Sequence, residues 1–304
     1  MSEPSDRPST PAKPTARSEE PWTVERLLRW VTEDFRGRGL ETPRLEAELL
    51  LCRALGWDRI RLITERDHEL EEPQLATLRA LVQRRRKREP VAYLMGQREF
   101  FGRPFRVDPR VLVPRPDTET LVETALRRTR DRCLFGRLLD LCTGSGNVAL
   151  SFARERPTWL VHAVDVSADA LAVARDNALR LGCAWNVKLL HGDLFEPVVG
   201  QRFDAITANP PYIPSDEVDR LPADVRDHEP RLALDGGADG LEVVRRLVAD
   251  ASGHLEPGGL LALEIGCDQH EEVSRLLQRA GFGEVELDRD LAGRPRVVSG
   301  RIGR

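Results

Sequence analysis

The sequence has few residues of the kinds that build cross-links or metal centres. It contains five cysteines, an odd number, and no two of them form a CxxC pair. This argues against a disulfide framework or a thiolate zinc site and favours a reducing cytoplasm as the compartment. The six histidines are scattered without an HExxH or HxxxH arrangement. We therefore expect no metal site.

Long apolar runs and an excess of positive charge are also missing. No segment approaches the eighteen consecutive apolar residues that indicate a membrane span, so we expect no membrane partner. The formal net charge is -4 at pH 7, whereas a chain that mainly grips nucleic-acid backbone is normally strongly basic. We therefore expect no stable nucleic-acid partner. The 40% hydrophobic and 32% charged residues fit an ordinary folded globular protein.

Composition and periodicity divide the chain into four segments. Residues 1–21 carry five prolines among serines, threonines and charges of both signs, a composition that predicts a disordered tail. Residues 22–90 predict a small helical domain. Residues 91–116 predict a connector with short strands. From 117 to 304, strand-like and helix-like segments alternate, which predicts an α/β domain with a doubly wound, mostly parallel sheet.

The small domain carries clear helix signals. Its first helix is expected behind a Thr23 cap, and its apolar residues recur at the spacing of one helix face: Val24, Leu27, Leu28, Val31 and Phe35. The second helix is expected to begin with Thr42 as its cap and Pro43 as its first residue, and to end at Gly56.

The third expected helix follows Pro73 and ends in the basic run Arg84–Arg88. Two interpretations of this run stay open. It is a solvated helix end that complements the helix dipole, or it is a contact for ribosomal or transfer RNA.

A glycine-rich loop follows the first strand of the alternating region. Gly144 and Gly146 let the backbone approach a ligand closely, and Asp165 closes the next strand, nineteen residues after Gly146. An acidic side chain there can accept both ribose hydroxyls of an adenosine. The loop fits a loose GxGxxA dinucleotide fingerprint, or an S-adenosyl-methionine (SAM) loop in which Asp140 and Thr143 precede the glycines. A tight turn without a ligand is the third interpretation.

Asp193 and Leu194 follow the third strand of this region. Because the carboxyl ends of parallel strands meet at one sheet edge, Asp193 is placed to accept from an adenine amine, with Leu194 beside the ring. An acidic residue at such a position is otherwise often a turn cap. Its register with the two preceding loops favours the ligand site.

The most specific motif is Asn209-Pro210-Pro211-Tyr212, at the end of an expected strand. Consecutive prolines fix the backbone and remove donors, which leaves the carbonyls as acceptors. The Asn209 side chain and the Pro210 carbonyl are expected to hold the two hydrogens of a planar NH2 group, against the flat face of Tyr212. Such a slot orients the nitrogen lone pair toward a methyl group. A plain Asn-Pro turn is the alternative.

The glycine-rich loop and this motif together resemble the amino methyltransferases of the class I SAM fold. Two further segments, Val113–Glu119 and Glu229–Gly240, resemble the protein-(glutamine) methyltransferases that modify bacterial peptide-chain release factors. The likeness spans residues 22–304. It implies SAM as cofactor and a mostly parallel sheet with an antiparallel strand near its edge, preceded by the small all-α domain. It also implies methyl transfer to the side-chain amide nitrogen of the glutamine in a Gly-Gly-Gln loop.

The resemblance assigns roles to particular residues. SAM contacts carry onto Cys142, Thr143, Gly144, Ser145, Gly146, Asp165, Leu194 and Asn209, and the substrate slot carries onto Asn209, Pro210, Pro211 and Tyr212. Members of that family often have glycine where Cys142 stands and tryptophan where Leu194 stands. These departures predict an altered SAM affinity without loss of activity.

Other functions stay open at this point. The same chemistry on a ribosomal-protein glutamine is one, and amine methylation of adenine or guanine in nucleic acid is another. A nicotinamide-dependent oxidoreductase leaves the Asn-Pro-Pro-Tyr motif unexplained, and a release-factor-binding scaffold requires an inactive SAM loop. Residues Glu229–Gly240 favour the release factor, and we expect a cytoplasmic monomer that methylates it.

Overall fold

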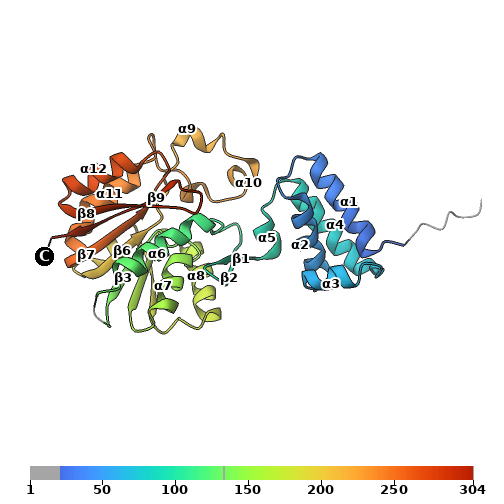
Figure 1. Ribbon diagram of the computed structural model, residues 1–304, viewed down its shortest axis with the longest axis horizontal. Coiled ribbons are helices and arrows are strands. Elements are labelled where there is room, and N and C mark those ends of the chain that lie inside the picture. The colour runs from blue at the N-terminus through green and yellow to red at the C-terminus, as the bar shows by residue number, and fades with distance from the viewer. Residues whose placement is uncertain (1–20, 133, 304) are drawn as a thin grey trace, which may run out of the picture. The chain divides into compact units, whose positions relative to one another are not determined.

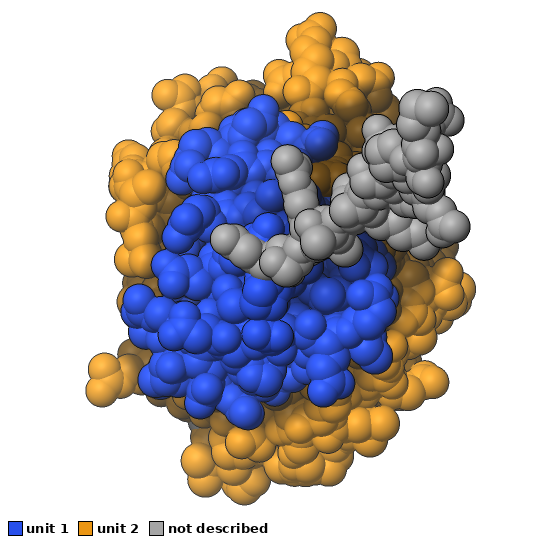
Figure 2. Space-filling model, turned by 90° about the vertical axis from the view of Figure 1, so that its right-hand side faces the viewer, with its two compact units in different colours: residues 1–82 blue, residues 83–304 orange. Residues whose placement is uncertain are grey.

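The computed structural model describes residues 21–132 and 134–303. The expected disordered tail lies outside the described residues, except for its last residue. The chain divides into two compact units between Val82 and Gln83, which are coloured separately in Figure 2. Within the described ranges, no helix is long and apolar enough to cross a membrane. The same ranges contain no group of three His, Cys, Asp or Glu side chains that could hold a metal ion.

The first unit is helical, and its helices are α1 (Val24–Gly37), α2 (Pro43–Leu55), α3 (Arg59–Thr64) and most of α4 (Glu72–Arg86). The Thr23 side chain accepts from the Arg26 amide and caps α1, and all five apolar residues predicted for its inner face are buried. Gly56 ends α2 in the left-handed conformation, as predicted. Thr42 is the cap residue and Pro43 the first residue of α2, as predicted, although the Thr42 hydroxyl bonds to the Glu46 side chain and not to a backbone amide.

The arginines of the basic run Arg84–Arg88 do not share one environment. Arg84 pairs with Glu89 at 2.5 Å, and Arg85 is only 4% exposed and pairs with Asp224 at 2.8 Å. The interpretation as a solvated helix end is therefore wrong for Arg85. Its guanidinium is buried against a carboxylate that lies far away in the sequence, and a pairing of that kind leaves no local signal.

Residues 91–106 contain a short helix and a hairpin: α5 (Val91–Met95), β1 (Gln97–Phe100) and β2 (Arg103–Arg106). The predicted short strands of the connector are present, and they pair antiparallel. Helix α5 was not expected, because five residues are too few for a periodic apolar pattern. The Tyr93 hydroxyl on α5 donates to the Val111 carbonyl at 2.6 Å and ties the helix to the chain beyond the hairpin.

The rest of the second unit alternates between strands and helices, as expected (Figure 1). The strands are β3 (Arg137–Leu141), β4 (Leu160–Asp165), β5 (Val187–His191), β6 (Phe203–Ala208), β7 (Leu255–Glu264), β8 (Phe282–Arg289) and β9 (Pro295–Ile302). The α-helices are α6 (Glu119–Arg128), α7 (Asn147–Glu155), α8 (Ala168–Arg180), α9 (Ser215–Val218), α10 (Ala223–Arg226), α11 (Glu242–Ala251) and α12 (His270–Arg279). Short 3-10 helices are η1 (Pro116–Thr118), η2 (Glu196–Val198), η3 (Arg231–Ala233) and η4 (Ser252–His254).

The seven strands form one sheet in the order β5-β4-β3-β6-β7-β9-β8. Strands β3 to β7 are parallel, and β9 runs antiparallel between β7 and β8. This is the class I SAM methyltransferase arrangement, with the antiparallel strand near one edge. The chain order reverses between β3 and β6, and ligands bind at the carboxyl ends of the strands at such a switch point.

Side chains alternate between the two faces of the sheet, and each face packs against its own helices. On β7, Leu260 and Ala262 join the apolar cluster that contains residues of α6 and α7, whereas Leu261 and Leu263 join the cluster with residues of α11 and α12. Figure 1 shows these helices in two layers about the sheet. The covered sheet therefore forms a rigid support for the loops at its edge.

Candidate active site

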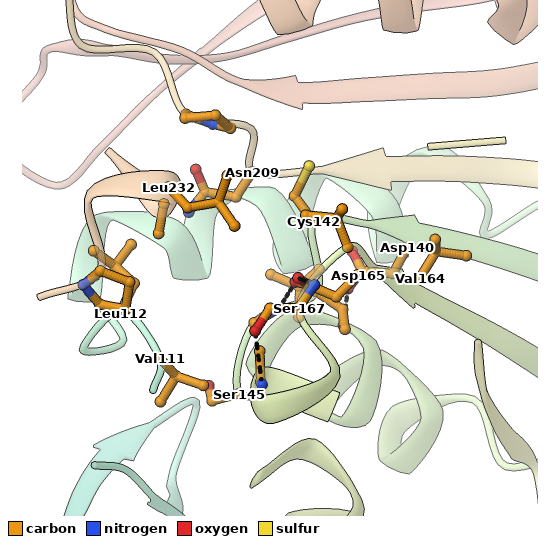
Figure 3. Close-up of a pocket in the computed structure, with 18 of the residues that line it drawn as sticks. Val111, Leu112, Asp140, Cys142, Ser145, Val164, Asp165, Ser167, Asn209 and Leu232 are labelled. Atoms are coloured by element: carbon orange, nitrogen blue, oxygen red, sulfur yellow. Dashed lines mark hydrogen bonds between the residues drawn. The ribbon is translucent and has the colours of Figure 1, made fainter. Parts of the chain in front are cut away.

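A cavity of about 300 Å³ lies at the carboxyl ends of β3 to β6, where the switch point predicts it. The predicted site residues that line it are Cys142, Thr143, Gly144, Ser145, Asp165, Asp193, Leu194, Asn209 and Pro211. In Figure 3, Asn209 and Leu232 lie on one side of the cavity, Cys142 and Asp165 on another, and Val111 and Leu112 across from them. The structure therefore brings four separate loops to one site.

The loop after β3 leaves room for a ligand at Gly144. This glycine has φ +56°, and a Cβ built on it would meet nothing within 4 Å. Gly146 has φ +81° and is the cap residue before α7, and a Cβ there would lie 2.9 Å from the Leu150 side chain. Gly144 thus opens the loop toward the cavity, whereas the glycine at 146 lets α7 pack closely; Gly146 itself does not line the cavity.

Asp165 joins the first two loops. Its Oδ2 accepts from the Gly144 amide at 2.8 Å, and its Oδ1 accepts from the Ser167 amide at 2.9 Å. Burial raises the pKa of this carboxyl, and the two amide hydrogen bonds oppose that rise. Each carboxylate oxygen still has a lone pair for a further donor, such as a ribose hydroxyl.

Asp140 lies beneath the loop and lines the cavity as well. It is 1% exposed, and its two oxygens accept from the hydroxyls of Thr143 at 2.6 Å and Thr207 at 2.7 Å. Burial raises the pKa of Asp140 to about 7. From the sequence, Asp140 was expected to precede the glycines of the loop, but no ligand contact was assigned to it. Its position at the end of a buried strand was the signal that could have predicted such a contact.

The third loop carries two residues with different surroundings. Asp193 accepts from Arg246 of α11 at 2.5 Å, and both residues line the cavity. Leu194 is buried and has φ +46°, a strained value for a residue that is not glycine. Arg246 was not predicted, because it comes from the exposed side of an ordinary amphipathic helix.

The Asn-Pro-Pro-Tyr motif follows β6, as predicted. Asn209 and Pro211 line the cavity, whereas Pro210 is buried and lies outside the lining. The Tyr212 hydroxyl donates to Oε1 of Glu264 at 3.3 Å, and burial raises the pKa of this phenol. The Tyr212 backbone carbonyl accepts from the Gln269 side chain at 2.9 Å. These contacts anchor Tyr212. The role of its ring as an aromatic platform stays a prediction.

The cavity is completed by two segments to which no site contact was assigned from the sequence. Pro114, Arg115 and Thr118 come from the chain before α6, and Pro230, Leu232 and Ala233 come from η3 and its approach. Their proline-rich composition was the available signal for ordered loops.

The backbone at position 142 favours the glycine that the resemblance led us to expect there. Cys142 has φ +56°, a left-handed value that favours glycine. Burial also raises the pKa of the Cys142 thiol, with the carboxylates of Asp165 and Asp140 adding to the effect. The thiol therefore stays protonated, which opposes a redox role and fits a small packed side chain.

The residues present fit SAM. Gly144 has no Cβ and opens the loop, the half-buried carboxylate of Asp165 keeps free lone pairs, and the buried Leu194 supplies an apolar wall. The carboxyl groups of Asp140 and Asp165 both line the cavity, and carboxylates favour a cationic ligand over a pyrophosphate. The chemistry of the site therefore suits an adenosine with a cationic sulfonium.

Comparisons with known proteins agree with this geometry. Residues 26–96 match the family model of the PrmC N-terminal domain, and residues 116–222 match that of the methyltransferase small domain. A solved 16S rRNA methyltransferase from T. thermophilus, in complex with AdoMet and guanosine, is 20% identical with a TM-score of 0.50. The match covers 68% of this chain and 49% of that chain, and at this identity it supports the fold alone.

Two curated relatives are much more similar. The release factor glutamine methyltransferase of Geobacter sulfurreducens is 45% identical over 93% of this chain and 98% of the relative. The protein of the same name from Moorella thermoacetica is 47% identical over 90% of this chain and 96% of the relative. At this identity and coverage, the chain belongs to the release factor glutamine methyltransferase family.

Proposed function

We propose that this enzyme transfers the methyl group of SAM to the side-chain amide nitrogen of the glutamine in the Gly-Gly-Gln loop of peptide-chain release factors. The observation that carries the proposal is that Asn209 lines the same cavity as Gly144 and Asp165. An amide acceptor thus lies next to a loop that suits SAM. Membership of the family supports the choice of a release factor as the substrate.

Distinct residues would hold SAM. Both oxygens of Asp165 are fixed by backbone amides, so their free lone pairs would accept from the ribose hydroxyls. Asp193 is oriented by Arg246 and would accept from the adenine amine, with Leu194 against the ring. The loop from Cys142 to Gly146 would approach the remainder of the molecule. SAM supplies an electrophilic methyl group on a sulfonium.

The substrate amide needs orientation more than deprotonation. Its nitrogen is a poor nucleophile because its lone pair is delocalised into the carbonyl. We propose that the Asn209 carbonyl and the Pro210 carbonyl each accept one amide hydrogen, with Pro211 and Tyr212 completing the slot. Held in this way, the nitrogen presents its lone pair to the methyl carbon. As the N–C bond forms, the bond between the methyl carbon and sulfur breaks, its electron pair stays on sulfur, and a neutral thioether is left. One proton of the nitrogen becomes acidic in this step and leaves to water.

The helical domain expected over residues 22–90 is proposed to recognise the release factor. Its match to the PrmC N-terminal domain supports this role. Hydrogen exchange measured with and without release factor tests it, because bound helices of this domain would gain protection. Unchanged exchange in these helices contradicts it.

Release factors act where translation ends, so we propose a cytoplasmic location. We also propose a monomer without a stable nucleic-acid partner, which the net charge of -4 supports. Light scattering measured with and without RNA tests the monomeric state and the absence of a stable nucleic-acid partner.

Mass spectrometry after incubation with SAM tests the activity. We expect a gain of one methyl group on the Gly-Gly-Gln glutamine of intact release factor, and none when that glutamine is replaced by alanine. Ribosomal proteins and nucleic acid are offered in parallel reactions. Methylation of either one in place of the release factor would contradict the proposed substrate.

A further inference from the structure

Gln269 is a buried amide side chain behind the Asn-Pro-Pro-Tyr motif, and the proposed reaction gives it no role. It is the cap residue before α12, but its side chain makes no cap hydrogen bond, and it is 9% exposed. Its Nε2 instead donates to the Tyr212 backbone carbonyl at 2.9 Å, and its Oε1 accepts from the Gly266 amide at 2.9 Å. One side chain therefore joins the loop after β7 to the last residue of the motif.

The two backbone partners leave the Gln269 amide a single orientation. A backbone N–H only donates and a backbone carbonyl only accepts. The Gly266 amide must therefore meet Oε1, and the NH2 group must face the Tyr212 carbonyl. Turning the side-chain amide over would oppose two donors at Gly266 and two acceptors at Tyr212. The contact with the motif is therefore specific in direction as well as in distance.

The motif itself has little conformational freedom except at its last residue. The rings of Pro210 and Pro211 fix φ at both positions, and each proline also restricts the residue before it. The main freedom left is ψ of Pro211 and the two backbone dihedrals of Tyr212. A hydrogen bond to the Tyr212 carbonyl thus acts at the point where the motif can still turn.

The chain packs tightly around this contact. Gly240 has φ +74°, and a Cβ built on it would collide with the Tyr212 carbonyl and lie 2.8 Å from the Gln269 Nε2. The next residue, Ile213, accepts at its carbonyl from the Gly236 amide at 2.8 Å. A side chain at position 240 would therefore separate Gln269 from the motif.

We propose that Gln269 is a positioning residue that holds the end of the Asn-Pro-Pro-Tyr motif, so that Asn209 and Pro211 keep their places in the cavity lining. Gln269 does not line the cavity, so it acts through Tyr212. The inference rests on the proposed role of the motif as the substrate slot. A displacement of about 1 Å in such a slot can lower the rate by about 100-fold.

Two variants of Gln269 test the proposal with release factor as substrate. Gln269→Glu has nearly the same shape and keeps an acceptor for the Gly266 amide, but an ionised carboxylate cannot donate to the Tyr212 carbonyl. Gln269→Ala removes both hydrogen bonds. For each protein, kcat, KM, the SAM dissociation constant and the thermal midpoint are measured.

Asn186→Asp is the matched control, because it makes the same change from amide to carboxylate at another buried position. Asn186 is 3% exposed and lies outside the cavity lining. Its Nδ2 donates to three backbone carbonyls, those of Ala153, Pro157 and Trp159. We expect this variant to lose thermal stability and to keep the wild-type kcat.

We expect both Gln269 variants to lower kcat by about 10- to 100-fold, with KM and the SAM dissociation constant within about threefold of wild type. The split arises because the expected SAM contacts lie on other loops. Unchanged kcat in both variants, an equal loss of SAM affinity, or an equal loss of kcat in Asn186→Asp overturns the positioning role.

A second readout does not depend on turnover. The sequence contains two tyrosines, Tyr93 and Tyr212, so NMR of protein labelled with ¹³C in the tyrosine rings gives two sets of signals, which Tyr93→Phe assigns. The Gln269 variants should shift or broaden the Tyr212 signals and leave those of Tyr93 unchanged. Unchanged Tyr212 signals overturn the inference even if the wild type is inactive on release factors. Inactive wild type with altered Tyr212 signals contradicts the proposed function alone.

The wild type alone supplies a third readout, which stands even where a variant fails to fold. The side-chain amide hydrogens of Gln269 should exchange with solvent more slowly than those of Gln278, an exposed residue of α12. Equal exchange at the two side chains overturns the inference, because the amide would not be held by the Tyr212 carbonyl.

Discussion

The Arg115 guanidinium donates to the Glu229 carboxylate at 2.5 Å, across 114 residues of chain. The second oxygen of Glu229 accepts from the Val113 amide at 3.1 Å. Glu229 is buried, and burial raises its pKa, while the Arg115 charge and hydrogen bond oppose that rise. The pair joins the two segments by which the sequence resembles the release factor methyltransferases, and both segments line the cavity.

Removing the cation should leave a buried acceptor without its partner. We expect Arg115→Ala to lower the free energy of unfolding by about 1–3 kcal/mol, measured by urea denaturation. The double variant Arg115→Ala with Glu229→Gln should recover part of the loss, because a neutral amide needs no counter-charge. Equal stability of wild type and Arg115→Ala would show that the pair contributes nothing.

Asp165→Ala should weaken SAM binding by about 1.5–3 kcal/mol, because charge-assisted hydrogen bonds to the ribose are lost. The loop also loses the acceptor for the Gly144 amide, so part of this effect is loss of loop order. Calorimetry measures the dissociation constant, and Asp165→Asn, which keeps one acceptor, should lie between the two. An unchanged constant in Asp165→Ala would remove Asp165 from the site.

Asn209→Ala should lower turnover by about 10²–10³, the range for loss of one preorganised hydrogen-bonding partner. SAM affinity should fall less, since most of its expected contacts lie elsewhere. Asn209→Asp keeps an acceptor and should retain partial activity, although its charge lies near the sulfonium. Methylation of a Gly-Gly-Gln substrate by Asn209→Ala at near the wild-type rate would refute the slot mechanism.

Asp140 should make stability depend on pH. Its pKa is about 7 in the folded protein, against an ordinary value of 3.8. The folded state therefore binds more protons between these values, so the free energy of unfolding should fall as pH rises from about 4 to about 7. Asp140→Asn should flatten this dependence in denaturation measured across the range. A slope as steep as that of wild type would assign the effect to other groups.

Cys142→Gly should not carry the usual cost of a glycine. Relief of the left-handed strain, about 1–2 kcal/mol, offsets the entropy that glycine adds to the unfolded chain, about 0.5–1 kcal/mol. We expect a thermal midpoint equal to or above that of wild type. Cys142→Val is the control, because a branched side chain fits this backbone poorly, and it should lower the midpoint.

Much of the cofactor side of the site could be predicted from the sequence. Gly144 marks a left-handed turn after a buried strand, and Asp165 ends the next strand. These are local properties of the backbone. Parallel topology then brings successive strand ends to the same edge, so spacing along the chain was enough to place Gly144, Asp165, Asp193 and Asn209 together.

Only the tertiary structure decided the pairs that join distant segments. Arg115 with Glu229, Arg85 with Asp224 and Tyr212 with Glu264 each depend on how distant segments of the chain pack. Buried polar groups must find partners in the folded protein, but no period or spacing in one sequence shows which partners they find. The sequence therefore determined the fold and the residues at the strand ends, and packing determined what orients them.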